Sequence, residues 1–132
     1  MAGLKIKLFA IAKNEGAYLA SWVFHHLYFG FDEVEVWLNG TSDNSVAICG
    51  ALSSYDGRIK YYNAEKDLQN CKSSGKPFQI YAYQKALESA KKSGSFTHIA
   101  FLDLDEYWVP RSFSGSIKDW ASSYSDADAI SF

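Results

Sequence analysis

The chain lacks a basic excess and a long uninterrupted apolar run, and each absence excludes a class of protein. Its 13 basic and 15 acidic residues give a formal net charge of −2, whereas general binders of nucleic acid or anionic membranes carry clustered basic residues. Lys5 and Lys7 interrupt the apolar start, residues 1–12, which is atypical of a signal peptide or a membrane span. We therefore expect a soluble protein with no membrane span in this chain and no nucleic-acid partner.

Cysteine is also scarce. Cys49 and Cys71 lie in unlike contexts and form no metal-type pair, so the sequence favours free thiols in a reducing compartment and a cytoplasmic location. The chain shows no internal repeat and no low-complexity tract. With 132 residues, 48% of them hydrophobic and 17% aromatic, it can bury one core, and we expect a single domain over residues 1–132.

Hydrophobic periodicity predicts that strands and helices alternate. Strands are expected at residues 4–12, 33–38, 58–62 and 97–102. Helices are expected from Asn14, as N-cap, to Gly30, from Ser42 or Asp43 to Gly57, and from Phe78 to Lys92. The polar stretch 63–77 is predicted to be a long loop near a site, with a short helix at 117–124 and the start of a further strand at 127–132.

This order implies an α/β fold: a mainly parallel sheet with helices on both faces, as in a Rossmann-like half. Ligands of such sheets bind beyond the carboxyl ends of the strands. Three polar clusters follow predicted strands, at residues 14–15, 39–43 and 103–106. We expect them to line one site.

The stretch 99–107, IAFLDLDEY, has the clearest chemical pattern. An apolar run typical of a strand buried on both faces is followed at once by three carboxylates. Side chains two positions apart on an extended backbone share a face, so Asp103 and Asp105 can point together and hold Mg²⁺ or Mn²⁺, often bridged to a substrate diphosphate. The spacing is equally compatible with solvated acids that cap the next turn.

Five features recur in a fixed order between residues 4 and 108. They are KNE at 13–15, Trp22 with His26 and Gly30, NGTSDNS at 39–45, Gln79 with Tyr83, and FLDLDEYW at 101–108. In this order and spacing they resemble the family 2-like glycosyltransferases, and most closely a subgroup with an fLDxDEF-type motif.

The resemblance implies a GT-A fold whose N-terminal part binds a nucleotide-diphosphate sugar, a UDP-sugar before others, through Mn²⁺ or Mg²⁺. The sugar would pass to a hydroxyl of a glycan or another acceptor, commonly with inversion. Asp103 and Asp105 would form the DxD pair and hold the metal, Asp105 as the main ligand and Asp103 nearer the ribose or sugar. The other nucleotide-sugar-binding residues implied by the resemblance are Ala12, Asn14, Glu15, Asn39 and Gln79.

A GT-A domain is normally much longer than 132 residues. We therefore expect this chain to be a fragment of a longer enzyme, with the catalytic base outside it, and the isolated fragment need not be active. Two other functions fit parts of the pattern. One is a non-catalytic nucleotide- or sugar-binding remnant. The other is a haloacid-dehalogenase-type phosphohydrolase, although that motif belongs on the first strand and needs a hydroxyl residue where Tyr107 stands.

The aromatic and histidine residues near these motifs have structural interpretations as well. His25 and His26 are adjacent on an apolar predicted helix, so at most one ring faces the core, and a hydrogen-bonded core histidine is favoured over a metal ligand. Trp108 directly follows the acidic motif and is the one tryptophan considered for contact with donor or acceptor.

Overall fold

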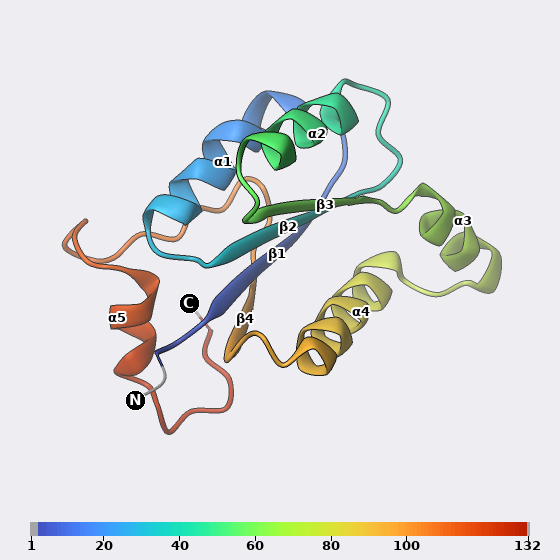
Figure 1. Cartoon of the computed structure of the whole chain (residues 1–132). Coiled ribbons are helices and arrows are strands. Elements are labelled where there is room, and N and C mark those ends of the chain that lie inside the picture. Colours follow the sequence, from blue (N-terminus) through green and yellow to red (C-terminus); the bar gives the residue numbers. More distant parts are fainter. Residues whose placement is uncertain (1–2, 132) are drawn as a thin grey trace.

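The computed structural model describes residues 3–131, in which strands and helices alternate along the chain (Figure 1). The strands are β1 (Ile6–Ala12), β2 (Glu33–Leu38), β3 (Ile59–Asn63) and β4 (His98–Phe101). The helices are α1 (Gly16–Tyr28), α2 (Ser45–Tyr55), α3 (Glu65–Ser74), α4 (Phe78–Ser93) and α5 (Ile117–Ser122).

The strands form one sheet in the order β3-β2-β1-β4, and every neighbouring pair is parallel. The predicted α/β fold with a parallel sheet is therefore confirmed. The register places Ala10 of β1 opposite Val36 of β2, and Phe9 opposite Phe101 of β4. β1 is apolar almost throughout because it lies inside the sheet, between β2 and β4, with a helical layer on each face.

Helices cover both faces of the sheet, as Figure 1 shows: α1 and α2 lie on one side and α4 on the other. The α1 side holds the larger core, in which Trp22, Leu19 and Val23 pack against Leu8 and the other even-numbered residues of β1. The segment after β4 and helix α5 extend this core through residues such as Leu104 and Ile117. On the α4 side, Phe9 packs against Ala82 and Ala86.

The prediction that residues 63–77 form a loop is wrong over most of that stretch, because helix α3 occupies Glu65–Ser74. Cys71 is its one buried residue, and Leu68 and Cys71 are its only apolar residues, so the apolar side of this helix is too short to reveal it in the sequence. Its ends carry the expected signals: Glu65 and Asp67 lie in the first turn, and Gly75 adopts a left-handed conformation with φ 72° at the C-cap.

One further difference concerns the last residues of the described chain. The prediction of a strand at 127–132 is wrong for residues 127–131, which pair with no other strand. Phe132 lies outside the described residues.

None of the helices between residues 3 and 131 combines the length and apolarity that crossing a bilayer requires. Cys49 and Cys71 are both free and buried, and burial raises the pKa of the Cys49 thiol to about 11.

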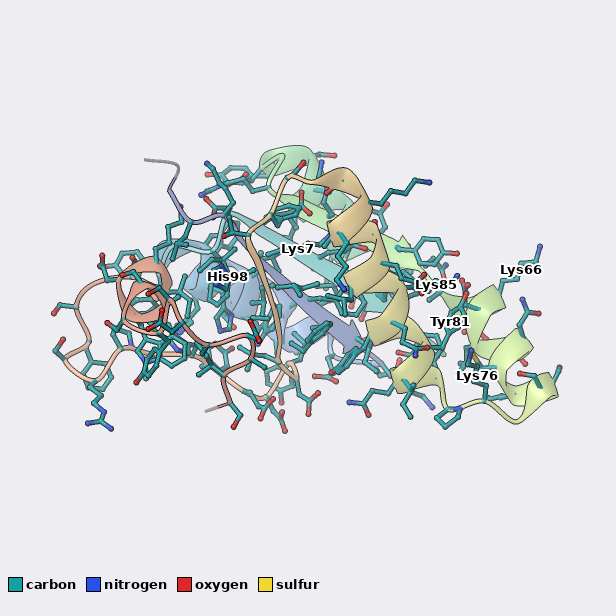
Figure 2. The ribbon with its side chains drawn as sticks, turned by 90° about the horizontal axis from the view of Figure 1, so that it is seen from below. Lys7, Lys66, Lys76, Tyr81, Lys85 and His98 are labelled. Atoms are coloured by element: carbon teal, nitrogen blue, oxygen red, sulfur yellow. The ribbon has the colours of Figure 1, made fainter. Side chains whose placement is uncertain are left out.

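One buried charge lies on the α4 face of the sheet. Figure 2 looks at this face and shows Lys7 among the strands, whereas Lys85 belongs to the covering helix α4 and Lys66 to α3, beyond the end of the sheet. The Lys7 ammonium lies 2.6 Å from Glu35 Oε1 and 3.2 Å from Glu33 Oε2, and its side chain is 6% exposed. These two carboxylates offset the cost of burial and hold the pKa of Lys7 above its ordinary value.

Replacement of Lys7 by methionine is expected to destabilise the protein by about 3 kcal/mol, because it leaves two part-buried carboxylates facing each other without a cation. Urea unfolding measures this change. Lys5→Met is the matched control: Lys5 is 62% exposed and lies 4.0 Å from Asp32, so its loss is expected to cost about 0.5 kcal/mol. Equal losses in the two variants would contradict the role assigned to Lys7.

Candidate functional site

The sheet order creates one position where ligands of parallel α/β sheets characteristically bind. From β1 the chain proceeds to β2 and β3 on one side, and it then returns to add β4 on the other side. β1 and β4 are adjacent parallel strands, so the loops that follow them start side by side at the carboxyl ends of the strands, where ligands of such sheets bind. Residues 13–15 follow β1 and residues 102–106 follow β4, so two of the predicted polar clusters meet here.

Four carboxylates gather at these strand ends: Glu15 after β1, and Asp103, Asp105 and Glu106 after β4. Burial raises the pKa of Asp103, and the charges of Glu106 and Asp105 raise it further. Burial also raises the pKa of Glu15, and the charges of Asp105 and Asp103 raise it further. Within residues 3–131 no lysine, arginine or histidine forms an ion pair with any of the four. The cluster is therefore an uncompensated negative site.

The acidic segment alternates between the core and the surface. Leu102 and Leu104 are buried in the α1-side core, whereas Asp103 and Asp105 are exposed. The Glu106 carboxylate accepts a hydrogen bond from the Asp103 N–H (2.8 Å), and the Glu106 N–H donates to the Asp103 carbonyl (3.0 Å). Glu106 thus caps the turn, which leaves the side chains of Asp103 and Asp105 for a ligand.

Helix α1 holds the chain directly after these aspartates. The Trp22 indole N–H donates to the Glu106 carbonyl (2.8 Å), and the Trp108 N–H donates to His26 Nε2 (3.1 Å). Because Nε2 accepts, the ring proton of His26 sits on Nδ1 and is donated to the Trp22 carbonyl (2.8 Å). His26 is thus the one core histidine of the adjacent pair, as predicted, and burial lowers its pKa to about 4. Trp108 is buried, so it is part of this anchor and not a ligand contact.

The loop after β1 is fixed to the loop after β2. Asn14 adopts a left-handed conformation with φ 54°, and its Oδ1 accepts from the N–H groups of Ser42 (2.7 Å) and Asp43 (3.1 Å). Asp43 in turn accepts from the Gly16 N–H (3.0 Å) and from Ser45. The prediction that Asn14 is the N-cap of α1 is therefore wrong. The cap position is Glu15, without a side-chain cap bond, and Asp43 binds the first turn from outside.

The remaining predicted residues lie at or beside the same edge. Ala12 ends β1 with its side chain in the core, and its carbonyl accepts the Asn39 N–H (3.1 Å); Ala12 therefore positions the site without offering a side chain to a ligand. Gln79, on α4, donates to the Tyr83 hydroxyl (3.3 Å). Burial raises the pKa of Tyr83, the hydrogen bond from Gln79 lowers it, and the charges of Asp103 and Glu106 raise it as well; no hydrogen bond joins Gln79 or Tyr83 to these carboxylates in the described residues.

Sequence reasoning assigned no separate role to Thr41, which lies in the loop after β2. Its hydroxyl oxygen is buried and is the one such side-chain atom in the described part of the chain that has no hydrogen-bond partner. A buried hydroxyl without a partner is costly, so it marks a position where a ligand or water can bind. The signal in the sequence is the polar turn 39–45 after an alternating strand, which marks the loop but not the residue.

No group of three or more His, Cys, Asp or Glu residues between residues 3 and 131 forms a complete metal cage. Mg²⁺ and related ions are commonly held by one or two carboxylates together with substrate phosphates. Two exposed, uncompensated aspartates fit that mode, in which the ion binds together with a diphosphate. An apolar hollow of about 660 Å³ lies beside β4, the last strand of the sheet, and reaches this cluster at Glu106. The aspartates themselves follow the carboxyl end of β4.

No protein-family model matches the chain, and a search of curated proteins finds no similar sequence.

Acidification is expected to weaken the anchor between α1 and the acidic segment. The folded state holds His26 neutral with a pKa of about 4, and the unfolded chain restores a value of 6.5. Protons therefore bind the unfolded state more strongly, and this contribution is complete above pH 6.5 and is lost as the pH falls towards 4. The expected loss is about 3 kcal/mol in the free energy of unfolding.

Urea unfolding at several pH values separates this effect from the titration of carboxylates. The difference in stability between the wild type and His26→Gln should shrink by about 3 kcal/mol between pH 7 and pH 4. His98→Gln, which changes an exposed histidine, should keep a constant difference. A difference for His26→Gln that does not change with pH would contradict the neutral anchor.

Proposed function

We propose that this chain is the donor-binding part of a metal-dependent glycosyltransferase of the GT-A type. It binds a nucleotide-diphosphate sugar, a UDP-sugar before others, and the enzyme transfers the sugar to a hydroxyl of a glycan or another acceptor with inversion. The observation that carries the proposal is the cluster of uncompensated carboxylates at the carboxyl ends of the adjacent strands β1 and β4.

The electrostatics of the cluster favour a cation that arrives with an anionic ligand. A nucleotide diphosphate alone would be repelled by Asp103, Asp105 and Glu15, whose mutual repulsion already raises the pKa of two of them. A divalent ion removes this repulsion, and Asp105 and Asp103 would hold it. When bound, Mn²⁺ or Mg²⁺ supplies stabilisation of the negative charge that develops on the leaving diphosphate.

The neighbouring residues position the ligand. The loop after β2, which contains Asn39 and Thr41, flanks the base and ribose, and the unpartnered Thr41 hydroxyl provides a hydrogen bond for the nucleotide. Asn14 keeps this loop next to β1 through its two backbone hydrogen bonds. The proposal assigns no catalytic base to the described residues. The acceptor side of the enzyme would supply it, so the chain alone would bind a donor without turnover.

Calorimetric titration with UDP, with and without Mn²⁺, tests the proposal. The wild type is expected to bind UDP when Mn²⁺ is present and to lose binding without it. Asp105→Asn should weaken UDP binding by at least about tenfold, because a carboxylate ligand is replaced by a neutral amide that binds a hard cation less strongly.

Asp126→Asn is the matched control, because Asp126 is an exposed acid after α5 and its change should leave the affinity unaltered. Binding of UDP without metal, or equal binding by Asp105→Asn and the wild type, would contradict the proposed site. Metal-dependent binding, combined with no transfer by the enzyme that contains the acceptor side, would instead favour a non-catalytic nucleotide-binding protein.

A further inference from the structure

Strand β4 is the last strand of the sheet and has a free edge. Its neighbour is β1, and no other strand within residues 3–131 pairs with its outer side. The Leu102 N–H, directly after β4, donates to the Phe9 carbonyl (3.3 Å). Because every second residue of a strand turns its backbone groups to the same neighbour, Ile99 and Phe101 direct their N–H and carbonyl groups away from β1. These groups form a row to which another strand can bind.

The two edges of the sheet differ in the side chains that they carry. Proteins commonly prevent unwanted pairing at a free edge with charged side chains, lysine above all, or with proline. The opposite edge strand, β3, carries an exposed lysine, Lys60. β4 has the sequence HIAF and contains no lysine, acid or proline. Three of its four residues are half-buried, so this edge is uncharged and recessed.

An apolar hollow of about 660 Å³ lies along the free edge of β4, and Figure 1 shows β4 between α4 and α5. Leu87 and Ala90 of α4 line the hollow, as do Ile117 and Ala121 of α5 and residues 127–131. The four residues of β4 extend over about 13 Å. A single extended segment of similar length would find backbone partners along the edge and apolar side chains on both sides.

The charged residues of the hollow indicate which end of such a segment carries which charge. Lys91 lies in the last turn of α4, which leads into the amino end of β4, and Glu106 follows the carboxyl end of β4. Asp128 also lines the hollow and is exposed to solvent. A complementary segment has an apolar centre, an acidic residue near Lys91 and a basic residue near Glu106.

We propose that the free edge of β4 binds one extended segment of another polypeptide, which becomes a fifth strand of the sheet. The segment pairs with the outward backbone groups of Ile99 and Phe101, and its apolar side chains enter the hollow. It runs antiparallel to β4, because antiparallel pairing is the more stable kind. A helix, a lipid or a nucleic acid offers no row of backbone donors and acceptors to this edge, so the edge selects a strand.

The elements beside β4 argue against a second copy of this chain as the occupant. In a second copy, β4 would lie in the same recess between its own α4 and α5, and these helices would hold the two edges apart. A single segment without flanking helices meets no such obstacle. The inference does not rest on the proposed function, because the edge would bind a strand whether or not the aspartates bind a metal and a nucleotide.

Titration of the ¹⁵N-labelled chain with the peptide acetyl-Lys-Val-Thr-Val-Thr-Val-Glu-amide tests the proposal. The peptide has high strand propensity and the end charges that an antiparallel segment needs. Saturable changes in amide shift are expected to centre on residues 98–102, and hydrogen exchange at the amides of Ile99 and Phe101 should slow at least about tenfold. The same peptide with its five central amides N-methylated cannot donate to the edge and should not bind.

Leu87→Glu should raise the dissociation constant of the peptide at least about tenfold, because it places a charge in the apolar lining. Leu87 is 38% exposed, so the variant should fold, as circular dichroism checks. Ile80→Glu is the matched control: Ile80 is 55% exposed on the same helix and does not line the hollow, and its change should leave the affinity unaltered.

Four results would overturn the proposal. One is a wild type that does not bind the peptide, and another is equal binding of the N-methylated peptide. The third is protection of the Ile99 and Phe101 amides before peptide is added, with contacts to residues 127–131, since the chain would then fill its own edge. The fourth is a dimer in sedimentation velocity that Leu87→Glu abolishes, since a second copy would then be the occupant.

Discussion

The position of β1 between β2 and β4 is the constraint on which the other features depend. β4 pairs with β1 in a register that sets Phe101 opposite Phe9, and the Leu102 N–H continues this pairing by donating to the Phe9 carbonyl (3.3 Å). The acidic segment therefore starts beside the last residues of β1, and its carboxylates lie close to Glu15. β1, in which every residue but Ile11 is buried, has little freedom to shift its register. β4 is an edge strand in which no residue is fully buried, so the expectation of a strand buried on both faces is wrong for it. The negative cluster is thus a consequence of how the sheet is assembled.

The groups that hold the candidate site differ from the groups that would bind a ligand. Backbone N–H and carbonyl groups of residues 103–108 bond to Trp22, His26 and the capping carboxylate of Glu106. Hydrogen bonds of Asn14 and Asp43 likewise fix the loop after β1 to the loop after β2. The side chains of Asp103 and Asp105 make none of these bonds and remain exposed. Such a supporting shell keeps a binding geometry rigid while its functional side chains stay available.

The sequence predicts the alternating fold well because periodicity reports which faces are buried. The apolar run before Asp103 and the strict alternation of Glu33–Leu38 both correspond to strands. It fails where stability comes from distant contacts or from few buried groups. Helix α3 buries one residue and contains only two apolar ones, Leu68 and Cys71. The role of Asn14 depends on residues 28 and 29 positions away, and the anchoring of Trp108 on a residue 82 positions away. No local pattern encodes these partners.

The most direct test of the central claim, that the carboxylate cluster between β1 and β4 binds a divalent cation with a diphosphate, is a map of paramagnetic broadening by Mn²⁺. Amide signals of the ¹⁵N-labelled chain would be followed during titration with Mn²⁺ in the presence of UDP. The account predicts that broadening centres on residues 103–106 and 14–16 and is absent from these residues in Asp105→Asn. Broadening centred elsewhere, such as on Glu33 and Glu35 beside Lys7, would contradict it.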